Sequence, residues 1–400
     1  MQALLVFLAI AALSLLASSR TLLDPSRLPG VAQLAASGLI FLVFGALLGP
    51  GLAGVLSWND LQGLRPVVSL GLGTAGVILG LNLDPRLLRL LPRPVFSAAV
   101  AHSGVAFLFV AVPLGGALLV NTRLSLTVVV GGAALLGAAA SLSSGHFAVL
   151  GYRSGRMERS RGLAVALLTM LDDGVGLLVL ALALVLGAAG SLADGVGLVA
   201  LALFLGVLCG GLIAFLTYAL KDAAELMAVM LGGVALVGGA AAYLRVSSLL
   251  AGVACGATLA LVGGRAVEQV ARALGRFERP TYLILLFLAG CYVQARDVNA
   301  WVLLPGYVGL RFLGKVWGGS LARRFAASTL ELPPRLGFAL IAQGGLALCL
   351  VVQYLLLVPG PLSQHVFDVV ALGAVVNEVV ASQAVRQVLE PPLRAKEGTA

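Results

Sequence analysis

The sequence predicts an all-α polytopic membrane protein of about 13 transmembrane helices, and two observations carry this prediction. Of its 400 residues, 60% are hydrophobic and only 11% are charged, and the mean hydropathy is +1.06. A soluble domain carries about 25% charged residues, so a soluble chain of this composition could not cover its surface. The apolar residues also fall into runs of about 20, the length that crosses a bilayer as a helix.

Thirteen candidate spans lie between charged residues, prolines and glycines. They are residues 2–19, 30–49, 66–83, 94–119, 124–149, 162–188, 191–219, 224–243, 247–263, 281–295, 299–322, 336–358 and 364–388. No basic segment precedes the first span and no small-residue cleavage site dominates its end, so we expect a retained helix rather than a signal peptide. The connecting loops are short. We therefore expect one membrane domain over residues 1–400 and no soluble domain.

Lys and Arg are sorted between the two sets of loops. Twenty of the 26 lie in the tail or in loops that follow odd-numbered spans, and only four lie in the opposite loops, namely Arg65, Arg123, Arg245 and Arg296. The positive-inside rule then places the N-terminus outside and the C-terminus in the cytoplasm. No run of Lys or Arg is dense enough for a nucleic-acid-binding face, so the net charge of +9 is a topology signal.

Five charged side chains stand out well inside the predicted spans, where a charge costs about 2.5–3.5 kcal/mol on insertion scales. They are Asp172 and Asp173 in span 162–188, Arg311 and Lys315 in span 299–322, and Glu378 in span 364–388. Two adjacent carboxylates repel, so at least one should hold its proton near neutrality. Such a pair can bind a small cation or protons but not both, which suits an exchanger. The alternative is a structural bridge from an aspartate to Lys or Arg. For Arg311 and Glu378 we expect a compensating ion pair.

Two spans carry polar interruptions that contain glycine. The first covers residues 140–146 with Ser143, Ser144 and His146, and the second covers residues 342–345 with Gln343. Irregular backbone at membrane depth is tolerated where it lines a cavity, and broken helices commonly coordinate ions. The interruptions fall in the middle members of two three-span groups, 94–188 and 299–388, which are offset by seven spans and so run in opposite senses. This inverted repeat is typical of a secondary transporter.

The histidines and cysteines predict less. His146 either relays protons beside the first interruption or packs against a freed carbonyl. We expect His102 to be a packing residue and His365 to lie in an external loop. The cysteines lie singly in apolar runs and predict buried small side chains rather than a metal or redox site; they are Cys209, Cys255, Cys291 and Cys349.

Six motifs spaced along the chain match the pattern of a known family. They are GLIFLVFGALLGPGL (38–52), LGLGTAGVILGLNLDP (70–85), SLSSGHFAVL (141–150), LTMLDDGVGLLVLAL (168–182), LGKVWGGSLARRF (313–325) and ALIAQGGLALCLVV (339–352). With these motifs the chain resembles, over essentially its whole length, the monovalent cation:proton antiporters of the CPA2 branch of the sodium/proton exchanger superfamily. The two aspartates combined with Lys315 are the most specific part of the resemblance.

The resemblance implies a Na⁺/H⁺ antiporter-like fold. In it a transport core, residues 94–188 and 299–388, moves against a dimerisation scaffold, residues 1–83 and 191–295. The implied activity is electrogenic exchange of Na⁺, or of Li⁺ or K⁺, for protons, with no cofactor and no enzymatic reaction. The resemblance assigns Asp173, with Asp172 beside it, as the carrier of the transported Na⁺ and of protons. It makes Lys315 the charge partner of Asp172 when the cation site is empty.

The resemblance also implies a homodimer in the bacterial inner membrane that serves pH homeostasis.

Three departures from the family pattern bear on ion selectivity and electrogenicity. The motif at residues 143–146 lacks the usual Thr, Gly345 stands where an acid is common, and Arg311 resembles the Arg of electroneutral relatives. Two other functions stay open, namely a sodium-coupled symporter of an organic anion on an inverted-repeat scaffold and a non-transporting membrane sensor.

Overall fold

All regular secondary structure in the described part of the chain is helical. A computed structural model describes residues 34, 37–83, 91–121, 124–144, 158–188, 191–220, 222–262, 265–294, 296–326 and 329–385. Its helices are α3 (Leu39–Leu48), α4 (Trp58–Asn82), α6 (Arg93–Asn121), α7 (Leu126–Ser141), α9 (Arg159–Gly187), α10 (Leu192–Ala219), α11 (Ala223–Tyr243), α12 (Ser248–Val262), α13 (Arg265–Cys291), α14 (Val298–Ala326), α15 (Leu336–Ala339), α16 (Gly345–Leu357) and α17 (Pro361–Val385). The predicted all-α fold is confirmed. The first predicted span, 2–19, lies outside the described residues.

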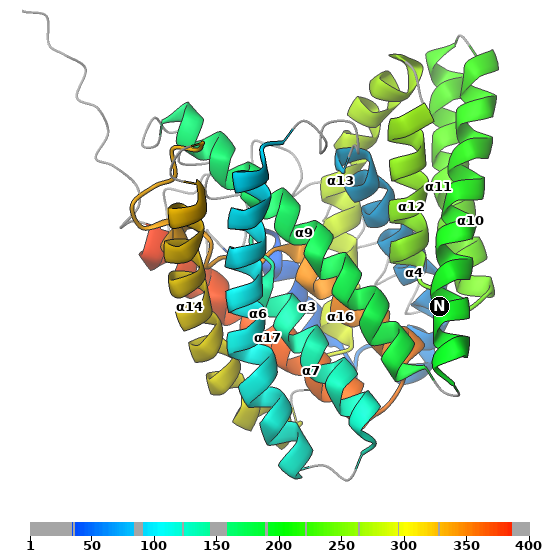
Figure 1. Cartoon of the computed structure of the whole chain (residues 1–400). Helices are drawn as coiled ribbons and strands as arrows, with labels where there is room; N and C mark the ends of the chain where they lie inside the picture. The colour runs from blue at the N-terminus through cyan, green and yellow to red at the C-terminus, as the bar shows by residue number, and fades with distance from the viewer. Residues whose placement is uncertain are drawn as a thin grey trace, which may run out of the picture.

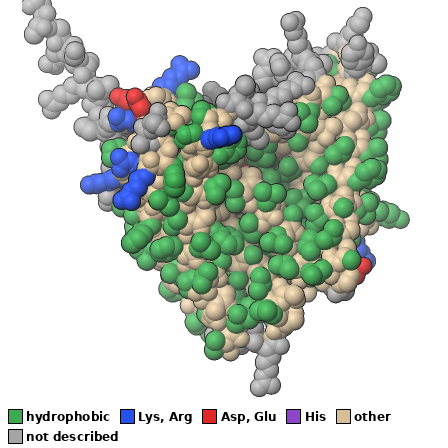
Figure 2. All heavy atoms as spheres, in the orientation of Figure 1, with side chains coloured by type: hydrophobic (Ala, Val, Ile, Leu, Met, Phe, Trp, Pro, Cys, Tyr) green, Lys and Arg blue, Asp and Glu red, His purple; other side chains and the backbone are tan. Residues whose placement is uncertain are grey.

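Six segments of the described chain are long and apolar enough to cross a membrane. They are Trp58–Asn82, Arg93–Val120, Arg159–Gly187, Leu192–Thr217, Ala224–Tyr243 and Pro361–Ala381. The helices α3, α7, α12 and α16 are apolar but shorter. Figure 2 shows hydrophobic side chains over most of the visible face, with Lys and Arg gathered mainly at one end. This surface suits a lipid environment on its sides and water at its ends.

Two helices begin eight or more residues before the predicted spans. The helix α4 begins at Trp58 rather than at 66 because Ser57 caps it. The Asp60 backbone N–H donates to Ser57 Oγ, and the Ser57 backbone N–H donates to the Asp60 carboxylate at 2.9 Å. The helix α13 begins at Arg265 rather than at 281, because the apolar residues of this stretch recur at the spacing of one helix face. The stretch between 265 and 280 is therefore helical and not a loop.

The predicted interruptions are confirmed as far as the structure describes them. The helix α7 ends at Ser141, and residues 142–144 continue without helical structure. In the second interrupted span, residues 340–344 separate the short helix α15 from α16. His146 lies outside the described residues.

The helices pack in two sets; in Figure 1, α4 and α10 to α12 lie to the right of α6, α7 and α14. One set contains α6, α7, α9 and α14 to α17, and its most extensive contact joins α6 to α14. The other set contains α3, α4 and α10 to α13, in which α12 packs on α4 and α10 and α13 packs on α3. Further contacts, such as α9 with α10 and α13 with α16, join the two sets. The interrupted helices lie inside the first set.

Glycines bring α4 and α12 into backbone contact. A Cβ added at Gly76 would lie 2.4 Å from the Leu249 carbonyl oxygen, and one at Gly256 would lie 2.1 Å from the Val77 carbonyl oxygen. Small residues four positions apart allow such close approach between membrane helices. The α4–α12 interface therefore depends on the absence of side chains at these glycines.

We expect Gly256→Ala to destabilise the protein by about 1–3 kcal/mol, because the new methyl group meets backbone atoms that cannot move aside. Thermal unfolding of the purified protein in detergent measures the loss. The matched control is Gly239→Ala on α11, where an added Cβ meets nothing within 4 Å. Equal unfolding temperatures for the two variants would contradict this account of the interface.

Candidate functional site

The two interrupted helices meet at their breaks. After α7 ends at Ser141, residues 142–144 cross residues 340–344 of the second break, and the Ser144 backbone N–H donates to the Ala342 carbonyl oxygen at 2.9 Å. A break leaves carbonyls without their helical partners, and in a membrane interior each such group needs another donor. The crossing therefore concentrates free backbone acceptors in the first helix set.

Arg311 on α14 supplies donors to these carbonyls. Its Nη2 donates to Leu142 O at 2.9 Å and reaches Ala342 O at 3.5 Å, while Nη1 donates to Ile341 O. The expected ion pair between Arg311 and Glu378 is absent among the described contacts, so that prediction was wrong. The physical reason is that the freed carbonyls offer the guanidinium three acceptors at the crossing itself.

Lys315 lies one turn further along α14 and is also fully buried. Its Nζ donates to Ser141 O, donates to Ser143 Oγ at 2.5 Å and lies 3.1 Å from His102 Nε2. The Asp172 Oδ2 atom is 4.0 Å away, at the outer limit of an ion pair. The ammonium thus sits at the C-terminal end of α7, where the helix dipole favours positive charge.

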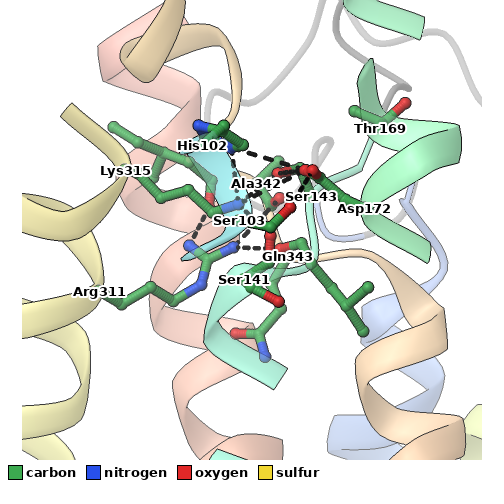
Figure 3. Close-up of polar contacts among 12 residues, drawn as sticks. His102, Ser103, Ser141, Ser143, Thr169, Asp172, Arg311, Lys315, Ala342 and Gln343 are labelled. Carbon is green, nitrogen blue, oxygen red and sulfur yellow. Dashed lines mark hydrogen bonds and ion pairs between the residues drawn. The ribbon is translucent and has the colours of Figure 1, made fainter. Parts of the chain in front are cut away.

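Asp172 on α9 faces this polar cluster, as Figure 3 shows. Its side chain is fully buried; Ser103 Oγ donates to Oδ1, and Ser143 Oγ donates to Oδ2 at 3.3 Å. The structure therefore brings together three residues that the sequence singled out separately, Asp172, Ser143 and Lys315. Ser143 links the two charges, since its hydroxyl donates to the carboxylate and accepts from the ammonium.

Asp173 points elsewhere, because consecutive residues of a helix differ by about 100° in direction. It lines a cavity of about 530 Å³ between the two helix sets. Ser144, Gln343 and Glu378 also line this cavity, and Glu278 and Arg279 of α13 line it as well. Within the described residues, the Asp173 carboxylate makes no hydrogen bond or ion pair. It is available to a ligand that enters the cavity.

His102 on α6 is part of the charged cluster, so its assignment as a packing residue was wrong. Its Nε2 lies 3.1 Å from Lys315 Nζ and 3.6 Å from Asp172 Oδ2. His102 and Ser103 are adjacent polar residues in a long apolar run, the same signal that marked the two aspartates. The sequence alone did not reveal their partners, because Lys315 on α14 and Asp172 on α9 lie far from α6 along the chain.

A second polar cluster lies beside the crossing. Gln343 Nε2 donates to Tyr307 Oη at 2.9 Å and to Ala139 O at 3.2 Å, and Asn377 Nδ2 donates to Gln343 Oε1 at 3.0 Å. These bonds tie the second break to α7, α14 and α17. Glu378 is buried, and its Oε2 atom has no hydrogen-bond partner among the described residues.

The remaining histidine and the cysteines lie away from this site. His365 lies in the second turn of α17, not in an external loop, because α17 already begins at Pro361; its Nδ1 pairs with the Asp297 carboxylate. All four cysteines are buried and free, as expected. In the described chain, no group of three or more His, Cys, Asp or Glu residues could hold a metal ion.

Comparisons with known proteins give a likeness in structure and none in sequence. No protein-family model and no curated protein matches the chain. Among solved structures, it is similar to the sodium proton antiporter MjNhaP1 from Methanocaldococcus jannaschii at pH 8, with a TM-score of 0.63 and 13% sequence identity over 98% of this chain and 100% of that chain. At this identity the likeness extends to the fold and no further. The chain has a sodium proton antiporter fold.

Proposed function

We propose that this protein is a secondary antiporter that exchanges a monovalent cation, Na⁺ foremost, for protons across a membrane. The observation that carries the proposal is the different environment of the two adjacent aspartates. Asp173 opens to a cavity without protein partners, while Asp172 is sealed in a cluster with Lys315. The antiporter fold supports the same conclusion.

The exchange chemistry follows from the carboxylates. A cation that enters the cavity can reach Asp173, with Ser144 and Gln343 also on the cavity wall as oxygen ligands. A carboxylate in a poorly solvated site is costly as a bare anion, so it holds either a cation or a proton. Cation and proton then compete for the same oxygens, and this competition couples their movements in opposite directions.

Lys315 rather than Arg311 is the coupling cation in this proposal. Arg311 is occupied by backbone carbonyls and has no carboxylate within ion-pair distance among the described contacts. Lys315 is 4.0 Å from Asp172 and can approach it when the cation leaves. In this proposal the two carboxylates carry two protons one way and one cation the other way, which moves one net charge per cycle. Lys315 balances the second carboxylate while the cation is bound.

Alternating access would come from movement of the first helix set, as transport core, against the second, as scaffold. The Asp173 cavity lies between them and includes Arg279, near the predicted cytoplasmic end. At the opposite end Gln364 Nε2 donates to Tyr292 O at 2.9 Å, and the Gln294 N–H donates to Asp368 Oδ1 at 3.0 Å. These bonds join α17 to the segment after α13.

The remaining assignments belong to the same proposal. We place the protein in the CPA2 branch, as a homodimer in the bacterial inner membrane with a cytoplasmic C-terminus and a part in pH homeostasis. The sodium-coupled symporter of an organic anion and the non-transporting sensor are less well supported. The buried Lys315 beside a carboxylate pair suits proton coupling and serves neither alternative.

We expect Asp173→Asn to reduce cation-driven proton movement at least tenfold, because the amide can neither balance a cation nor carry a proton. The measurement is the pH change inside proteoliposomes after Na⁺, Li⁺ or K⁺ is added separately. Asp194→Asn is the matched control, since Asp194 is exposed in the first turn of α10 and should leave exchange unchanged.

Near-normal exchange by Asp173→Asn would refute the assignment of the carrier. Sodium uptake stimulated by an organic anion, without proton counterflow, would favour the symporter. A wild-type protein without any cation-dependent pH signal would favour the sensor.

Lys315→Gln and Arg311→Gln should have different effects. Lys315→Gln should keep exchange but weaken its response to an imposed membrane potential, because without the ammonium the second carboxylate stays protonated when the cation binds and one proton then exchanges for one cation. Arg311→Gln should lower the unfolding temperature in detergent, because buried carbonyls lose donors at about 1–3 kcal/mol each. A voltage response unchanged in Lys315→Gln but lost in a folded Arg311→Gln would reverse the two roles.

A further inference from the structure

The packing of α6 against α14 fixes where His102 points. A Cβ at Gly314 would lie 2.8 Å from Ala106 Cα, and one at Gly318 would lie 2.7 Å from His102 O and 3.3 Å from His102 Nδ1. These two glycines are four positions apart, the spacing that permits close helix contact. With the backbones this close, the His102 ring reaches the Lys315 ammonium, and Figure 3 shows the two side chains next to each other.

Lys315 has three N–H donors, and the structure provides three neutral acceptors for them. These are Ser141 O, Ser143 Oγ and His102 Nε2. The ammonium is therefore satisfied without Asp172, whose nearer oxygen is 4.0 Å away. This conformation therefore holds a charged Lys315 without a close ion pair to Asp172.

The direction of the Lys315–His102 hydrogen bond determines the tautomer of the His102 ring. An ammonium only donates, so Nε2 accepts and the ring proton lies on Nδ1. His102 Nδ1 is buried and has no partner among the described residues. An apolar side chain at this position would avoid that unsatisfied N–H, so packing alone does not account for a histidine here. The groups that face the ring are Lys315 and Arg311 from α14 and Asp172 from α9.

We propose that His102 is a positioning residue that holds Lys315 away from Asp172 and thereby lowers the cost of binding the cation. This inference rests on the exchange function proposed above. Without the acceptor on His102, one N–H of Lys315 would turn to the Asp172 carboxylate and strengthen the ion pair. The charge of Asp172 would then be balanced by a closer ammonium and would attract the incoming cation at Asp173 less strongly.

The test replaces His102 by Leu, which removes the acceptor, and by Gln, whose Oε1 can reach the position of Nε2. We expect His102→Leu to raise the KM for Na⁺ about fivefold with little change in kcat, which corresponds to about 1 kcal/mol of binding free energy. His102→Gln should keep the KM near that of the wild type. Proteoliposome exchange at several Na⁺ concentrations gives both constants.

A second readout does not depend on transport. Na⁺ that binds the folded protein raises its unfolding temperature in detergent, and the Na⁺ concentration for half of this rise should shift by the same factor. In a Lys315→Gln background, His102→Leu should change neither value, because the group that it positions is absent. If His102→Leu does not fold, His102→Asn takes its place, because the Asn side chain is too short for its oxygen to reach Lys315.

An unchanged KM in His102→Leu, or an equal KM rise in the Lys315→Gln background, would overturn the inference while leaving the exchange function intact. A KM for Na⁺ that rises in His102→Gln as much as in His102→Leu would also overturn the inference. A wild-type protein that shows no cation-dependent proton movement would instead refute the proposed function itself, and the role of His102 with it.

Discussion

The site depends on how two broken helices are satisfied inside a membrane. Each break frees carbonyls that would cost several kcal/mol if left without a donor in hydrocarbon. The crossing bond between Ser144 and Ala342 satisfies only one of them. Arg311 and Lys315, one turn apart on α14, donate to the carbonyls of Ile341, Leu142 and Ser141. Two buried charges and several free carbonyls are each unfavourable alone, and together they satisfy one another.

This arrangement explains why glycine is frequent where helices meet. Arg311 and Lys315 reach the crossing only if α14 lies close to its neighbours, and Gly314 and Gly318 bring it against α6. Gly319 brings the same helix against Gly337 of α15, where an added Cβ would lie 2.5 Å from the Gly337 nitrogen. Large side chains at these positions would separate the helices by more than a hydrogen bond can span. Close packing is thus a condition for the polar chemistry.

The sequence predicted the fold and the charged residues because charge and interruption are conspicuous in an apolar chain. The aspartate pair, Lys315 and the two breaks were all found in this way. What the pattern could not supply was pairing across helices. Arg311 was assigned to Glu378 because opposite charges attract, but the competing carbonyls exist only after the two breaks cross. His102 carried the same polar-in-apolar signal, yet a single histidine does not reveal which helix lies opposite it.

Asp172 and Asp173 are adjacent on one helix but lie in different environments. Neighbouring residues on a helix point about 100° apart, so a cluster that encloses Asp172 leaves Asp173 facing the cavity. The two residues are adjacent on α9, so the charges of their carboxylates repel each other. The contacts of Asp172 with Ser103, Ser143 and Lys315 therefore set the electrostatic background against which Asp173 binds its ligand. A change in the charge or contacts of Asp172 therefore alters the affinity of Asp173 for its ligand, although the two side chains share no contact partner.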